Sequence, residues 1–190
     1  MDYTHLSLVD IGRELEQIAR DTRERFGRLD AQQLNWKPDA TRWSVAQCLE
    51  HLMTANRLML RGAADALTPS RPKTIWQRLP LLPAVFGPMM VRSQAPENTR
   101  RFTAPPAARP ATSDVGGDIV EHFIEQHRDA AGRVSLLDER VASETIMVSP
   151  FVRVMTYSVL DGWRLLVAHD RRHLAQANRV MDAPGFPIHT

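Results

Sequence analysis

In the segment HDRRH, two histidines have the spacing of paired metal ligands. His169 and His173 are four residues apart. On a helix, side chains at this spacing share one face, with Cβ atoms about 5–6 Å apart. Two neutral imidazoles there can bind one divalent ion at about 2.0–2.1 Å. The same spacing also arises by chance on many helices, so the pair alone does not establish a site.

A third histidine supports the metal interpretation. His51 lies seven residues after Ser44, on the apolar side of a predicted helix that also carries Cys48. A lone histidine on such a face is usually a hydrogen-bonded core residue, but opposite His169 and His173 it completes a three-imidazole set. Three protein ligands leave positions open for water or substrate, which is typical of reactive metal sites. Zinc, nickel, copper and iron all suit this set, and we favour zinc or nickel.

The other histidines are weaker candidates. His122 and His127 are five residues apart, a rotation of about 500°, so on a helix they point about 140° away from each other. They cannot both face one ion, and we predict that neither is a ligand. His5 and His189 lie near the two ends of the sequence and are also excluded.

Other residues that could bind a metal or contact its ligands are assigned different roles. We predict that Cys48 is a small buried hydrophobe rather than a ligand. Asp170 and Glu50 are adjacent to ligands in the sequence but point away on ideal helices, so we expect both to be solvated. Glu121 and Glu125 are the candidates to accept the second ring N–H of each imidazole, an interaction that metal-binding histidines commonly make.

Apolar residues recur every three or four positions in four segments, which predicts amphipathic helices. Ser44, followed three residues later by Gln47, is a capping box that begins the second of them. The predicted helices span 4–29, 44–67, 114–141 and 157–182.

The second and third predicted helices are separated by a proline-rich crossover, over residues 68–113. Its prolines exclude a long regular helix. Two apolar pieces, 75–82 and 85–91, are predicted to form single turns packed on the body. No alternation is strong enough to predict a sheet. The sequence therefore predicts one all-α domain over residues 1–190, a four-helix bundle with one long connection.

Two longer motifs resemble the DinB-like (DinB/YfiT) superfamily: WSVAQCLEHL, beginning at Trp43, and AHDRRHLAQANRV, beginning at Ala168. The later segment APGFP is similar as well. The resemblance implies an up-down-down-up four-helix bundle with a metal site at one end of its core. The family pattern of one histidine on the second helix and two on the fourth falls on His51, His169 and His173. It also implies a homodimer, since members often pair through bundle faces.

Composition excludes several classes of partner. The 24 basic and 22 acidic residues are interleaved, whereas a nucleic-acid-binding protein concentrates basic residues on one face. No apolar run approaches the roughly 18–20 residues of a membrane span, and the segment MDYTHLSLVD does not resemble a signal peptide. The single cysteine allows no intramolecular disulfide and suits a reducing compartment. We therefore expect a cytoplasmic protein whose partner is a small molecule, not nucleic acid or a membrane.

Three functions remain open for this metal site. The first is an enzyme of the S-transferase or isomerase type that uses a low-molecular-weight thiol on a small electrophile, as some members of the resembled superfamily do. A divalent ion favours this chemistry because it stabilises a thiolate. The second is a metal-dependent hydrolase, although no general base is evident. The third is a non-catalytic metal-binding protein of a stress response.

Overall fold

The structure, a computed structural model, describes residues 1–68, 74–78, 82–98, 100, 103–111 and 114–187. Four long helices dominate this part of the chain, which confirms the all-α prediction: α1 (Leu8–Phe26), α3 (Val45–Leu67), α5 (Ile119–Val134) and α7 (Val159–Met181). The shorter elements are α2 (Ala31–Asn35), α4 (Leu82–Gln94), α6 (Glu139–Glu144), the 3₁₀ turns η1 (Tyr3–His5), η2 (Trp76–Arg78) and η3 (Pro106–Ala108), and the strands β1 (Ile146–Val148) and β2 (Thr156–Ser158).

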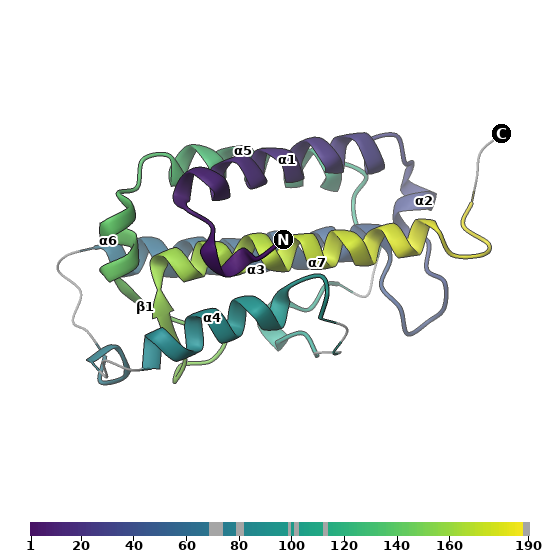
Figure 1. The fold of residues 1–190 in the computed structure, drawn as a ribbon. Coiled ribbons are helices and arrows are strands. Elements are labelled where there is room, and N and C mark those ends of the chain that lie inside the picture. Colours follow the sequence, from purple (N-terminus) through teal and green to yellow (C-terminus); the bar gives the residue numbers. More distant parts are fainter. Residues whose placement is uncertain (69–73, 79–81, 99, 101–102, 112–113, 188–190) are drawn as a thin grey trace.

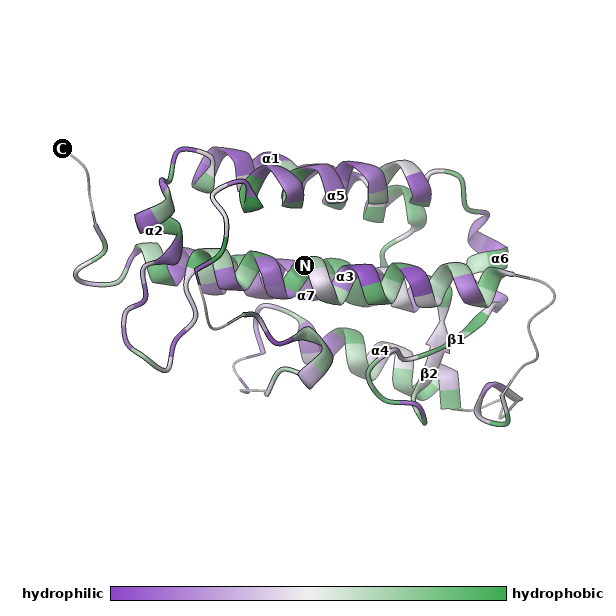
Figure 2. Cartoon of the chain, turned by 180° about the vertical axis from the view of Figure 1, so that it is seen from behind, coloured by the Kyte–Doolittle hydropathy of each residue, from purple (hydrophilic) through white to green (hydrophobic). Residues whose placement is uncertain are grey.

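The four long helices pack as a closed ring of neighbours. Helix α1 contacts α5 and α7, and α3 contacts the same two helices. Figure 1 shows α1 and α7 running in one direction and α3 and α5 in the other. The green, hydrophobic segments of α1 and α5 turn toward α3 and α7 (Figure 2). Fully buried side chains from three of these helices, Ile11, Leu15, Leu49, Leu52 and Phe123, fill the space between them.

Side-chain caps set where these helices begin. Ser44 and Gln47 form the predicted capping box, since the Ser44 hydroxyl accepts the Gln47 N–H and the Gln47 amide accepts the Ser44 N–H. A second box, between Ser7 and Asp10, starts α1 at Leu8. The predicted start at residue 4 is therefore wrong, and the preceding residues form η1 instead.

The predicted helix 114–141 is two helices. It begins later, at Ile119, and α5 ends at Val134. The chain then restarts as α6 because the Asp138 side chain accepts the N–H of Val141 and caps a new helix.

Two further expectations are wrong. Residues 146–148 and 156–158 pair as an antiparallel hairpin, with Met147 opposite Tyr157. Both of these side chains are buried, but three residues per strand are too few to show alternation. The apolar piece 85–91 is part of a continuous helix, α4, which packs along α7 and β2 on the outside of the ring (Figure 1).

The other apolar piece of the crossover, 75–82, is described only in part. Trp76–Arg78 form the single turn η2, and residues 79–81 lie outside the described residues. Among the helices that the structure describes, none combines the length and apolar character needed to cross a bilayer.

Candidate metal centre

Helices α3 and α7 bring the three predicted ligands to one point. They lie side by side and run in opposite directions (Figure 1), so the first half of α3 meets the second half of α7. The potential ligand atoms of His51, His169 and His173 all lie within 4.8 Å of one another. The His51 and His169 Nε2 atoms are 3.3 Å apart. The ring centroids of His173 lie 4.6 Å from those of both His51 and His169.

In two of the rings, a hydrogen bond at Nδ1 leaves the Nε2 lone pair available to bind a metal. The Nδ1 atom of His51 lies 2.5 Å from the Ala108 carbonyl oxygen. A carbonyl only accepts, so Nδ1 carries the hydrogen and the Nε2 atom of a neutral ring presents its lone pair toward His169. In the same way, the Nδ1 atom of His173 lies 2.9 Å from the Gln176 side-chain oxygen. This donor set fits a divalent cation of the zinc or nickel type.

Burial keeps these rings neutral. It lowers the pKa of His51, lowers that of His169 well below its ordinary value, and lowers that of His173 to about 3. The charges of the neighbouring imidazoles add to the effect at His169 and His173. Since only a neutral imidazole can bind a metal, the cluster needs no deprotonation before it binds one near pH 7.

Trp43 covers two of the ligand rings. Its ring centroid lies 4.9 Å from that of His51 and 5.7 Å from that of His173. The Trp43 and His173 rings are nearly parallel, at 22°, whereas the Trp43 and His51 rings are tilted by 51°. From the sequence, its position directly before the Ser44 cap indicates only a packing role. Its contact with His173 could not be predicted, because that contact depends on how α7 pairs with α3.

The predicted partners of the imidazole N–H groups were wrong. Glu121 pairs with Arg23 at 2.7 Å on the surface, and Glu125 is exposed on α5. For His51 and His173, the partners are the Ala108 carbonyl and the Gln176 side-chain oxygen. The role of Gln176 could have been predicted from its spacing, because it lies one helical turn after His173 on the same face. The role of Ala108 could not have been predicted in this way, because its backbone carbonyl makes the contact.

The prediction that Asp170 is solvated is also wrong. Its side chain is fully buried and lies 2.9 Å from Nε2 of His127. Asn56 donates to both carboxylate oxygens, at 3.0 and 3.2 Å. Helix α7 has α1, α3 and α4 packed around it, so a residue that points away from His169 still faces protein.

The remaining histidines that the structure describes lie outside the three-histidine cluster. The other ring nitrogen of His127 lies 2.8 Å from the Phe123 carbonyl, which accounts for both nitrogens of this buried ring. His122 and His5 are exposed, and His189 lies outside the described residues.

Cys48 and Glu50 flank the ligand turn of α3. Cys48 is fully buried, and burial raises the pKa of its thiol to about 12, so it remains a protonated hydrophobe. Glu50, predicted to be solvated, is only partly exposed, and its carboxylate accepts the Ala111 N–H at 2.7 Å.

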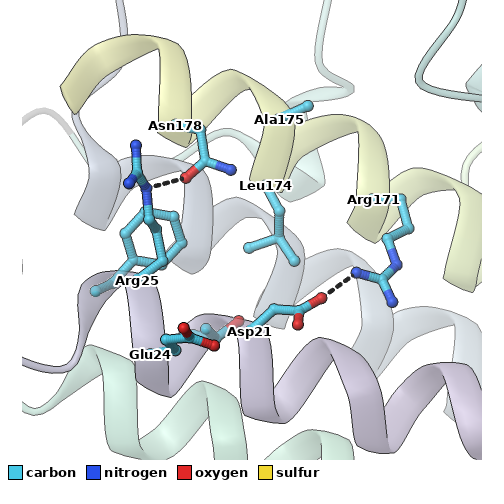
Figure 3. A pocket seen from close by; sticks show the side chains of 9 residues that line it. Asp21, Glu24, Arg25, Arg171, Leu174, Ala175 and Asn178 are labelled. Carbon is cyan, nitrogen blue, oxygen red and sulfur yellow. Dashed lines mark hydrogen bonds and ion pairs between the residues drawn. The ribbon is translucent and has the colours of Figure 1, made fainter. Parts of the chain in front are cut away.

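A surface hollow of about 480 Å³ lies between α1 and α7, and none of the three histidines lines it. Two polar bridges cross it, from Arg171 to Asp21 and from Arg25 to Asn178, on either side of Leu174 (Figure 3). These groups hold the two helices together.

The fold and the cluster define the class: an all-α protein with a candidate three-histidine metal centre between two antiparallel helices. The sequence model of the DinB superfamily matches residues 14–177, a range that includes all three histidines. The chain belongs to the DinB superfamily, which confirms the resemblance found in its motifs. Neither the curated proteins nor the solved structures contain a match to this chain.

Proposed function

We propose that this protein binds one divalent cation, zinc or nickel, through His51, His169 and His173. We further propose that it is an enzyme of the S-transferase or isomerase type, which uses a low-molecular-weight thiol on a small electrophile. The observation that carries the proposal is the convergence of three neutral imidazoles within 4.8 Å. Membership of the DinB superfamily supports it, because some members of that superfamily use such thiols.

His51, His173 and Trp43 have defined parts in this proposal. A bound divalent ion would supply stabilisation of a thiolate near neutral pH. His51 and His173 present Nε2 because Ala108 and Gln176 hold their Nδ1 atoms. Trp43 shields the rings of His51 and His173. Three protein ligands leave coordination positions open for the thiol.

The proposal includes the surroundings of the site. The four long helices form one up-down-down-up four-helix bundle domain, and two copies pair as a homodimer. The partner is a small molecule in the cytoplasm rather than nucleic acid or a membrane. Hydrolysis is less well supported, since Glu50 and Asp170, the carboxylates next to ligands in the sequence, are both engaged in hydrogen bonds.

The test is a conjugation assay with a fluorogenic electrophile and a panel of low-molecular-weight thiols. We expect thioether formation by the zinc- or nickel-loaded protein, lost with a chelator and restored by adding the metal back. The variant His51→Ala, given the same metal, is the inactive control. Turnover that persists in the chelated protein would contradict the proposal, and metal binding without turnover on any thiol would favour a non-catalytic role.

A further inference from the structure

One residue of the crossover is held at both of its backbone polar groups by α3. The Ala111 N–H donates to the Glu50 carboxylate at 2.7 Å, and the Ala111 carbonyl accepts from the Gln47 amide at 2.7 Å. Gln47 and Glu50 lie on the turn of α3 that leads to His51. The crossover is therefore anchored at Ala111 beside the ligand turn.

The short segment before this anchor is stiff. Pro105, Pro106 and Pro110 each have a fixed φ, which reduces the freedom of the chain between them. The 3₁₀ turn η3 adds a hydrogen bond from the Ala108 N–H to the Pro105 carbonyl at 2.9 Å. Ala108 itself is 1% exposed. Because the segment is stiff, we expect a displacement at Ala111 to move Ala108 as well.

Ala108 in turn determines which nitrogen of His51 is available. Its carbonyl oxygen, 2.5 Å from Nδ1, holds the ring hydrogen on that atom and leaves the lone pair on Nε2. The Nε2 atom is the one that faces His169, at 3.3 Å. If the carbonyl moved away, the ring hydrogen could occupy either nitrogen, and the fraction of His51 ready to bind a metal would fall.

We infer that Glu50 is a positioning residue for the metal centre, acting on His51 through Ala111 and the Ala108 carbonyl. The part of this inference that concerns metal affinity rests on the proposed function. The part that concerns the tautomer of His51 does not, because the hydrogen bonds involved are made by the protein alone.

The experiment measures both parts on the full chain. Protein labelled with ¹⁵N-histidine, free of metal, reports the His51 tautomer by NMR, and a zinc titration reports affinity. We expect the unaltered protein to hold His51 as the Nδ1–H form. Glu50→Ala should give a mixture of tautomers and weaken zinc binding about tenfold, the lower end of the effect of an outer-shell change.

Two conservative variants distinguish the effect of the length of the Glu50 side chain from the effect of its negative charge. Glu50→Gln keeps an oxygen that can accept the Ala111 N–H, so we expect a single tautomer and near-normal affinity. Glu50→Asp keeps the charge but is one methylene shorter, so we expect it to resemble Glu50→Ala. Glu125→Ala, on the exposed face of α5, is the matched control and should change neither measurement. Circular dichroism verifies that each variant is folded.

Two results would overturn the inference: an unchanged His51 tautomer in Glu50→Ala, whatever its zinc affinity, or a Glu50→Gln variant as impaired as Glu50→Ala. If the unaltered protein binds no zinc or nickel, the proposed function fails, and the tautomer measurement still decides the role of Glu50.

Discussion

Replacing His169 with alanine is expected to abolish stoichiometric binding of zinc or nickel. His169 lies 3.3 Å from His51 at Nε2, and its ring centroid is 4.6 Å from that of His173. Without it, two imidazoles remain. The loss of metal affinity should exceed the roughly 10–100-fold loss seen when a residue that hydrogen-bonds to a ligand is changed. Metal analysis after dialysis, together with calorimetric titration, measures the change.

The matched control for this substitution is His122→Ala. This histidine is also on a long helix, but its side chain is half exposed and lies near Asp118. It should leave one equivalent of metal bound per chain. If His169→Ala also retained one equivalent at unchanged affinity, the three-histidine site would be wrong.

The second large effect is expected on stability rather than on binding. Asp170→Ala should lower the free energy of unfolding by about 3–5 kcal/mol, the usual loss when one partner of a buried pair is removed. The carboxylate has two buried partners, His127 and Asn56, whose donor groups would face an empty space in the core. Urea unfolding of the metal-free protein, followed by circular dichroism, gives the difference without a contribution from bound ligand.

Asp129→Ala is the comparison for this prediction. Asp129 pairs with Arg133 at 2.7 Å on the exposed side of α5, and exposed pairs of this kind contribute about 0–1 kcal/mol. The two aspartates therefore differ mainly in burial. If Asp170→Ala lowered the free energy of unfolding by less than about 1 kcal/mol, the buried hydrogen bonds of Asp170 would contribute no more than an exposed ion pair, and the prediction would be wrong.

The ligand set could be predicted from the sequence because helical periodicity converts spacing into direction. The Ser44 cap defines the start of α3, and the spacing from that cap places His51 on the inward face. His169 and His173 follow the same rule on α7. Ligands that depend on helical phase and a clear cap are the part of a site that local sequence specifies.

Helix α4 could not be predicted because tertiary contacts override its prolines. Pro83 lies in the first turn, where a helix needs no N–H, and Pro88 removes one interior hydrogen bond. What compensates is packing on α7 and β2. Gly87 makes this approach possible, because a β-carbon there would collide with the carboxylate of Asp161 on α7. None of these contacts is visible in the sequence of the crossover.

Asp170 and Ala108 show a second limit. A helical projection separates one apolar face from one solvated face, and α7 has neighbours on more than one side, so the projection placed a buried carboxylate in water. The Ala108 carbonyl is a backbone group whose role depends on where a proline-rich segment lies. Side-chain type carries no information about such a role.

The packing of Trp43 against two ligand rings provides the protein with an intrinsic fluorescence probe. An indole at 4.9 and 5.7 Å from the His51 and His173 rings lies close enough for its emission to respond to what those rings bind. We expect nickel, with an open d shell, to quench this fluorescence and zinc, with a filled one, to leave it nearly unchanged. Trp43→Phe, which retains the other three tryptophans, should abolish the nickel response; quenching that persisted in this variant would place the bound ion elsewhere.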